Sequence, residues 1–308
     1  MKKYITNILL FFAIVAMIDL CIGYFGDYLQ AHAKGGVTMR INDIAMKDCH
    51  DVVVLGSSRA HHHYDTPFLS DSLKFDVYNA GFDGNGIVLG EGLLELILER
   101  YRPQLIIYDV EPSFDILEYD NDNHCIRYIN NLKPYYRHQA INELINDVSK
   151  EEWYKIHSGL IRYNSNLITL FIDNVRATPV EPYGFLPSMG QYNVVITEKK
   201  HRANHVAVNG LKLKYIEKLI NTAQKHDVSL IFVASPKYGA ADSDELQPVK
   251  DICKNKNVAF LDYYTSEVFQ NNVYFKEPMH LNRDGARIFT KEILNQIIKN
   301  KYVNTVAN

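Results

Sequence analysis

Two serines that directly follow a buried-type hydrophobic stretch are the first residues of the chain placed to do chemistry. Residues 52–55 are Val-Val-Val-Leu, and Gly56, Ser57 and Ser58 come next. A short continuous run of β-branched residues is typical of a strand buried on both faces, as in the middle of a parallel sheet. Ligands bind at the carboxyl ends of such strands. The serines are therefore candidates for a nucleophile, although serine is also a favoured cap for the helix expected to follow.

A histidine and an acid near the other end of the chain complete a hydrolase-like set. Glu277 precedes His280 by three residues, in a loop expected to return to the carboxyl edge of the sheet before a last helix. A serine hydrolase requires a nucleophile, a histidine that takes its proton and an acid that fixes the tautomer of the histidine. We therefore predict Ser58, His280 and Glu277 as the catalytic residues; the alternative for His280 is a purely structural role.

The elements that must position these residues alternate between strand and helix. The hydrophobic pattern predicts helices at residues 87–101, 210–225, 244–254 and 283–299. It predicts strands at residues 52–55, 75–80, 105–110, 228–234 and 258–262. Because strand–helix–strand units with right-handed crossovers build parallel sheets, we predict an α/β fold. The expected architecture is a flavodoxin-like three-layer α/β/α sandwich with a five-stranded parallel sheet, in a domain at residues 49–300.

A long segment between the third and fourth strands breaks this alternation. Residues 112–209 are polar and rich in aromatic side chains, and helices are expected around residues 139–157 and 164–175. Loops of this length in a compact domain are often functional. We predict a helical insertion that serves either as a lid or substrate platform, or as a layer that only stabilises the sheet.

The N-terminus predicts a membrane anchor. Lys2 and Lys3 precede residues 8–25, whose only charged member is Asp19. At ~1.5 Å per residue this helix is just long enough to cross a hydrocarbon core of ~30 Å. The lysines favour a cytoplasmic N-terminus, which leaves the remaining chain outside, in the periplasm or at the cell surface. We expect an uncleaved signal anchor at residues 1–26 and a connector at residues 27–48, with a flexible point at Gly35-Gly36.

Several other classes of function are disfavoured. The net charge of −3 and the lack of a basic stripe argue against nucleic acid binding. The glycine-rich turn at residues 81–86 lacks the order of a nucleotide loop. Adjacent histidines at residues 61–63 point in different directions, and the four cysteines are too widely spaced for a zinc site or a disulfide framework. We therefore expect no metal and no cofactor.

These motifs resemble the SGNH/GDSL hydrolases over roughly residues 51–100 and 228–299. The first block of the family is Gly-Asp-Ser after a strand, and Gly56-Ser57-Ser58 puts Ser58 in the place of the nucleophile. The second block matches residues 79–84 and implies the backbone amides of Gly84 and Ser58 as an oxyanion hole. The last block, Asp-x-x-His, is matched by Glu277-x-x-His280, with an acid one methylene longer.

The third block departs from the family, which has Gly-x-Asn-Asp after the third strand, the Asn donating to the oxyanion. Residues 109–113 contain no such Asn, and the loss of one oxyanion donor costs on the order of a hundredfold in rate or more. Asn85 or Ser113 is a candidate to replace it. Arg59 is expected either to hold an anionic group of the substrate or to form a surface salt bridge, and Ser57 is a second candidate for substrate binding.

The anchor and the altered blocks are most similar to membrane-tethered relatives. These include the D-alanyl-transfer protein of teichoic acid synthesis and the O-acetyltransferases of alginate-type exopolysaccharides. The resemblance implies an enzyme that cleaves or transfers acyl esters on envelope glycans, beside a membrane-bound acyltransferase partner. The alternative is a membrane-tethered carbohydrate-binding or scaffold protein that kept the fold and lost its oxyanion donors.

Overall fold

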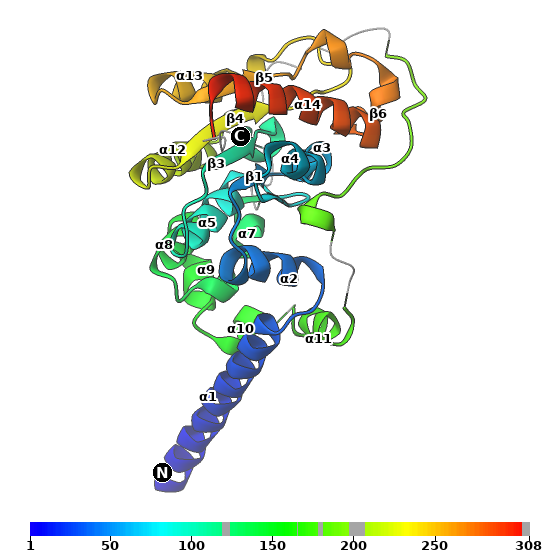
Figure 1. Ribbon diagram of the computed structural model, residues 1–308. Coiled ribbons are helices and arrows are strands. Elements are labelled where there is room, and N and C mark those ends of the chain that lie inside the picture. Colours follow the sequence, from blue (N-terminus) through cyan, green and yellow to red (C-terminus); the bar gives the residue numbers. More distant parts are fainter. Residues whose placement is uncertain (119–123, 165, 178–180, 197–206, 304–308) are drawn as a thin grey trace. The chain divides into compact units, whose positions relative to one another are not determined.

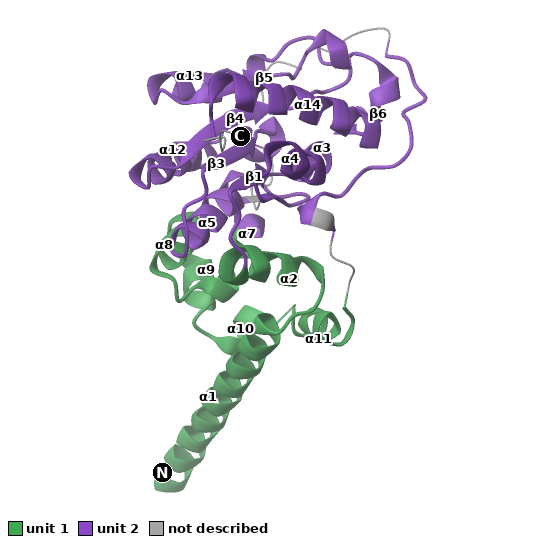
Figure 2. Ribbon diagram, in the orientation of Figure 1, with its two compact units in different colours: residues 1–47, 129–180 green, residues 48–128, 181–308 purple. Residues whose placement is uncertain are grey.

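The computed structural model describes residues 1–118, 124–164, 166–177, 181–196 and 207–303 of the 308-residue chain. The chain divides into two compact units, which are coloured separately in Figure 2. Unit 1 consists of Met1–Lys47 and Ile129–Val180, and unit 2 consists of Asp48–Tyr128 and Glu181–Asn308. Each unit therefore contains two stretches that are far apart in the sequence.

Unit 2 is built on a five-stranded parallel sheet with the strand order β2-β1-β3-β4-β5 (Figure 1). Its strands are β1 (Val52–Gly56), β2 (Val77–Gly81), β3 (Leu105–Asp109), β4 (Ser229–Ala234) and β5 (Ala259–Asp262). Since the strands are parallel, all five end at the same edge. The order and the helices on both faces confirm the predicted flavodoxin-like sandwich.

Alternate residues of each strand supply the two faces of the sheet. Val52 and Val54 lie in one core with the apolar residues of α3, α4 and α14. On the other face, α5 approaches so closely that a Cβ on Gly90 would lie 2.7 Å from the ring of Tyr108. The covering helices are α3 (Ser58–His63), α4 (Thr66–Leu73), α5 (Ile87–Leu98), α12 (Gly210–Lys225), α13 (Gln247–Asn255) and α14 (Arg283–Asn300).

A short hairpin that the sequence did not predict follows the sheet. It consists of β6 (Phe275–Glu277) and β7 (His280–Leu281), which pair antiparallel in the stretch expected to be a loop. Unit 2 is completed by α6 (Pro112–Asp115), by α7 (His124–Ile129), which reaches the boundary with unit 1, and by short helical turns. These are η3 (Pro182–Gly184), η4 (Asp244–Leu246), η5 (Glu267–Phe269) and η6 (Asn272–Tyr274).

Unit 1 is helical and is formed by two stretches of the chain. Its first stretch holds α1 (Lys2–Ala31), α2 (Gly36–Asn42) and the π-helical turn η1 (Asp43–Lys47), which include most of the connector predicted at residues 27–48. Only part of the predicted insertion, residues 129–180, belongs to this unit. Its helices are η2 (Lys133–Tyr135), α8 (Gln139–Val148), α9 (Lys150–Lys155), α10 (Gly159–Tyr163) and α11 (Leu167–Val175). Of these elements, α1 is long and apolar enough to cross a membrane.

Candidate active site

The two serines in the turn after β1 have different environments. Gly56 has a φ of +141°, and a Cβ there would lie 2.6 Å from the carbonyl oxygen of Asp109, so the turn requires glycine. Ser57 is fully buried and caps α3, since its Oγ accepts a hydrogen bond from the amide of Arg59 at 3.4 Å. Ser58 is the first residue of α3 and is half-buried. The capping role thus falls to Ser57, which is not exposed for substrate binding, while the hydroxyl of Ser58 is left for other contacts.

The hairpin brings His280 to this hydroxyl. The distance from Ser58 Oγ to His280 Nε2 is 2.7 Å, although the residues are 222 positions apart. Within the hairpin Glu277 pairs with His280, and its Oε1 hydrogen-bonds to His280 Nδ1. The second carboxylate oxygen of Glu277 accepts a hydrogen bond from the backbone amide of Met279 at 3.0 Å. The three residues predicted from the sequence therefore form one continuous chain of hydrogen bonds.

The negative charge of the Glu277 carboxylate favours one tautomer of His280. Although burial acts to raise the pKa of Glu277, the hydrogen bonds from His280 and from the Met279 amide outweigh it, so this pKa lies below its ordinary value. An ionised carboxylate can only accept a hydrogen bond, so the nitrogen that faces it, His280 Nδ1, carries the proton and donates. Nε2 therefore presents a lone pair to the Ser58 hydroxyl. This is the arrangement needed for His280 to take a proton from Ser58.

A second histidine fixes the backbone beside His280. The amide of Leu281 donates to His63 Nε2 at 3.0 Å, and His63 Nδ1 donates to Ser235 Oγ at 2.9 Å. His63 is fully buried; burial, followed by the positive charge of Arg59, lowers its pKa well below the ordinary value. His63 is therefore neutral and holds β7 in place through a hydrogen bond that needs an unprotonated nitrogen.

Arg59 has a role that both sequence-based expectations missed. Its side chain is 1% exposed and forms a buried ion pair with Glu111, with Nη1 and Oε2 2.9 Å apart. The guanidinium also donates to Ser235 Oγ at 3.1 Å and to the carbonyl oxygens of Ser235 and Pro236. Arg59 is thus neither available to an anionic substrate nor part of a surface salt bridge. It ties the start of α3 to the ends of β3 and β4.

Asp109, at the end of β3, completes this buried network. Its carboxylate accepts hydrogen bonds from the hydroxyl of Tyr64 at 2.6 Å and from the hydroxyl of Ser235 at 3.1 Å. Burial raises the pKa of Asp109 to about 6. The only sequence signal for this role was its position after a buried strand, and nothing local indicated Ser235 as the partner.

Two backbone amides are available where an oxyanion hole was predicted. Among the described residues, neither the amide of Ser58 nor that of Gly84 has a protein acceptor. Gly84 adopts a φ of +66°, which suits glycine. Asn85 is buried, and its side-chain amide donates to the carbonyl oxygen of Asp83 at 3.0 Å, so one of its N–H groups serves the loop itself. Ser113 lies in α6, where its amide donates to Glu111 at 3.2 Å.

Arg127, in α7, is a neighbour of this loop that the sequence did not single out. A Cβ built on Gly84 would lie 2.7 Å from Arg127 Nη2, so the guanidinium lies directly against the loop. The side chain is exposed, in contrast to that of Arg59. It is the arginine that the structure places beside the predicted oxyanion donor.

Two of the adjacent histidines share one carboxylate, contrary to the expectation that they diverge. His61 Nδ1 lies 2.8 Å from Asp83 Oδ1, and His62 Nε2 lies 3.4 Å from Asp83 Oδ2. Burial acts to raise the pKa of Asp83, but the hydrogen bonds from the two imidazoles outweigh it and lower this pKa. These three groups are of the kind that zinc binds, and their ligand atoms lie within 4.8 Å of one another. The direct hydrogen bonds fasten the loop that carries Gly84 to α3.

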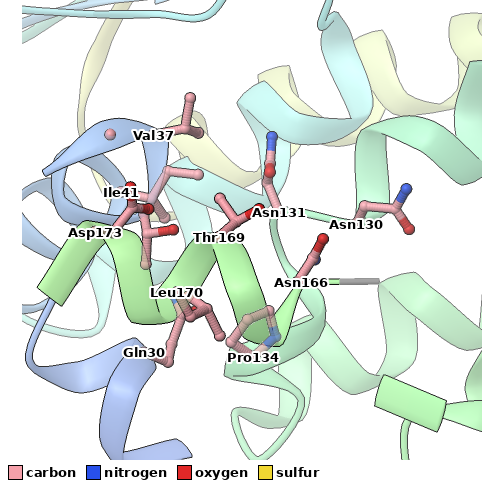
Figure 3. Close-up of a pocket in the computed structure, with 12 residues that line it drawn as sticks. Gln30, Val37, Ile41, Asn130, Asn131, Pro134, Asn166, Thr169, Leu170 and Asp173 are labelled. Atoms are coloured by element: carbon pink, nitrogen blue, oxygen red, sulfur yellow. The ribbon is translucent and has the colours of Figure 1, made fainter. Parts of the chain in front are cut away.

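Unit 1 has a separate cavity of about 220 Å³ (Figure 3). Its polar lining consists of Gln30, Thr38, Asn130, Asn131, Asn166, Thr169 and Asp173. Amide and hydroxyl groups of this kind donate to and accept from neutral polar ligands.

Comparison with models of protein families found no match, and no curated protein matches the sequence. Among solved structures, the chain is similar to the psychrotrophic esterase EstA from Pseudoalteromonas sp., inhibited by monoethylphosphonate. The two are 10% identical with a TM-score of 0.42, over 82% of this chain and 100% of the other. It is also similar to a G-D-S-L family protein from Desulfitobacterium hafniense DCB-2. That pair is 9% identical with a TM-score of 0.38, over 80% and 98% of the two chains. At these values the likeness does not indicate activity, substrate or residue roles.

Proposed function

We propose that the protein is a serine-dependent hydrolase or acyltransferase of the SGNH type that acts on acyl esters. The observation that carries this proposal is the 2.7 Å contact between Ser58 Oγ and His280 Nε2, with Glu277 on the other ring nitrogen. A serine and a histidine on different elements of the chain have no structural need to meet in this way. The buried network behind them holds both α3 and β7, so the contact is preorganised.

The reaction follows from these contacts. Ser58 Oγ attacks the acyl carbon while its proton passes to His280 Nε2, and Glu277 stabilises the imidazolium that forms. The tetrahedral intermediate collapses to an acyl-enzyme, and His280 returns the proton to the leaving alcohol. A water or a sugar hydroxyl then attacks the acyl-enzyme by the same steps in reverse. Water makes the protein an esterase, and a sugar hydroxyl makes it a transferase.

The amides of Ser58 and Gly84 are the proposed oxyanion donors. Both are backbone groups without a protein acceptor among the described residues, and one lies at the first position of a helix. Arg127 replaces Arg59 as the cation proposed to contact a negatively charged part of the substrate, since it is exposed and lies against Gly84. We propose acyl groups on glycans of the cell envelope as the substrate, such as O-acetyl esters.

Helix α1 is the proposed membrane anchor. It is apolar over a length that can cross a membrane, and Lys2 and Lys3 precede the apolar segment. With lysines on the cytoplasmic side, the remaining chain lies outside the membrane. This location would place Ser58 among envelope glycans and near a membrane-bound acyltransferase partner.

Labelling with a fluorophosphonate tests the chemistry, since this reagent reacts only with an activated serine. We expect the full-length chain in detergent to gain one adduct by intact mass, and Ser58→Ala and His280→Ala to gain none. Ser57→Ala is the matched control: it alters the adjacent serine, which caps α3, and should still be labelled. A folded wild-type protein that is not labelled, or a Ser58→Ala variant that is labelled, would contradict the proposal.

A carbohydrate-binding or scaffold function is the second candidate. The cavity of unit 1 favours it, because its amide and hydroxyl groups suit the hydroxyls of a sugar. Titration calorimetry with envelope oligosaccharides separates the two functions. Binding that is lost in Asn131→Ala, in a protein that no fluorophosphonate labels, would replace the enzymatic proposal.

A further inference from the structure

Helix α11 presents an apolar face that no described part of the chain covers. Four of its large apolar side chains recur at the spacing of one helical face and are between 49% and 76% exposed. They are Ile168, Phe171, Ile172 and Val175. The opposite side of the helix carries Leu170, which is buried against Leu29 and Tyr163. Soluble surfaces rarely expose a continuous apolar patch of this kind, so this face indicates an interaction site.

The neighbouring helix α10 adds to the patch and is attached to α1 at a defined level. The carboxylate of Asp19 accepts hydrogen bonds from Ser158 Oγ at 2.6 Å and from the amides of Gly159 and Leu160 at 3.1 and 2.9 Å. Leu160 and Ile161 are themselves exposed. Asp19, costly within a membrane, therefore has its partners on its own chain.

These contacts give the depth of the patch along α1. Asp19 lies six residues, or about 9 Å, before the end of the apolar segment at residue 25. Leu29, which contacts α11, lies about 6 Å beyond that end. Figure 2 shows α10 beside the last turns of α1, with α11 close by. Both helices therefore lie where the apolar segment of α1 meets water.

Polar groups at the same level suit a membrane surface. Asp27 pairs with Arg162 and Arg137, each at 3.0 Å, and accepts the hydroxyl of Tyr163 at 2.6 Å. The side chain of Arg137 is 67% exposed, and the ring of Tyr28, the residue after Asp27 on α1, is exposed as well. Tyrosine is enriched at membrane–water interfaces, and a long arginine side chain buries its stem while its charged end reaches the headgroups.

We propose that α10 and α11 form a second membrane contact, lying in the interfacial layer of the bilayer that α1 crosses. Their exposed apolar side chains enter the acyl chains to the ~5–10 Å typical of interfacial helices, and the exposed Arg137 meets the headgroups. Unit 1 then contacts the membrane through α10 and α11 as well as through α1. The inference rests on α1 as the proposed anchor and is independent of the chemistry at Ser58.

Nitroxide labels in the full-length chain test this contact. The chain, with its four cysteines replaced, is placed in nanodiscs of an equal mixture of phosphatidylethanolamine and phosphatidylglycerol. Labels are attached through Phe171→Cys and, as a second site, Val175→Cys. Ile298→Cys is the matched control, because Ile298 is an exposed isoleucine on a helix of unit 2. Spin relaxation then measures collision with oxygen, which concentrates in lipid, and with a water-soluble nickel chelate.

We expect the oxygen-to-nickel collision ratio at positions 171 and 175 to exceed that at position 298 several-fold. Equal ratios at the three positions would mean that the patch lies in water, and the proposal would fail. Labels at 171 and 175 shielded from both reagents would mean that a protein surface covers the patch, which also overturns it. Fluorophosphonate labelling of Ser58 in the same samples reports separately on the proposed chemistry.

Discussion

Replacing Arg59 with methionine tests the interpretation that this residue supports the site from within. The guanidinium is fully buried and faces Glu111, whose side chain is 3% exposed. Methionine keeps most of the length of the side chain and removes the charge, so the carboxylate of Glu111 loses its partner. Breaking a buried ion pair from one side typically costs about 3–5 kcal/mol. The carbonyl oxygens of Ser235 and Pro236 also lose their donor.

For a unit of this size, about 1 kcal/mol lowers Tm by roughly 2–4 °C, so Arg59→Met should lower the Tm of unit 2 by roughly 6–20 °C. Differential scanning calorimetry of the full chain in detergent measures this shift. Lys250→Met is the matched control: Lys250 Nζ lies 2.6 Å from Asp262, but both side chains reach solvent. Such a pair contributes less than about 1 kcal/mol.

The double variant Arg59→Met with Glu111→Gln removes both charges together. Because Glu111 then no longer leaves an unpaired charge buried, it should be more stable than the sum of the single changes predicts, by about 2 kcal/mol. A shift for Arg59→Met no larger than that for Lys250→Met would refute the reasoning. Strict additivity in the double variant would do so as well, since it would mean that the two charges do not interact.

Three further predictions concern single residues of unit 2. Glu277→Gln should slow fluorophosphonate labelling of Ser58 on the order of a thousandfold, measured as a rate by intact mass, because the amide no longer fixes the His280 tautomer; an unchanged rate would argue against this role. Gly84→Ala forces a left-handed conformation on alanine and should cost about 1 kcal/mol in thermal unfolding. Because the strained loop shifts the amide of residue 84, the variant should also label at least about tenfold more slowly, and an unchanged rate would contradict the proposal that the glycine conformation positions this donor. Burial raises the pKa of Glu91 to about 8, so the wild type loses stability as pH rises from about 4.5 through 8. Glu91→Gln should remove this loss and be more stable than wild type at about pH 9, by at most about 5 kcal/mol in denaturant unfolding, and equal pH profiles would contradict the buried charge.

The sheet and the contact among the three candidate catalytic residues were predictable because their signals are local. The continuous apolar runs at β1 and β3 leave little choice but buried parallel strands, and α12 was predicted at its observed bounds. Parallel strands end at one edge, so a serine after the first strand and a histidine before the last helix were expected to meet. The short hairpin that orients Glu277 was missed, because its three-residue and two-residue strands are too short to leave a pattern.

The supporting network and unit 1 depend on contacts that no local pattern shows. Arg59 and Ser235 are 176 residues apart, and a charged residue beside a nucleophile suggests a surface role until its partners are known. Unit 1 forms because Asp19 and Asp27 bind groups about 140 residues away. The sequence shows the charge of these residues but not their partners, so these contacts were not part of the prediction of a connector at residues 27–48.

His63→Gln tests whether a neutral histidine supports the hairpin. The pKa of His63 is lowered well below its ordinary value of 6.5 in the folded protein, so unfolding takes up a proton at acid pH. The contribution of His63 to stability is therefore present above about pH 6.5 and is lost as pH falls below that value. Glutamine does not titrate, and its side-chain oxygen is able to accept the amide of Leu281.

The variant should therefore lose less stability than the wild type between about pH 7 and pH 5, as measured by denaturant unfolding at both values. Ser58 should still be labelled at neutral pH in this variant, because the glutamine oxygen keeps the hydrogen bond from the Leu281 amide that holds β7. Glu91→Gln alters the alkaline side of the profile and separates the two effects. If His63→Gln and wild type lose stability equally on acidification, His63 is not the buried neutral group that holds the backbone next to His280.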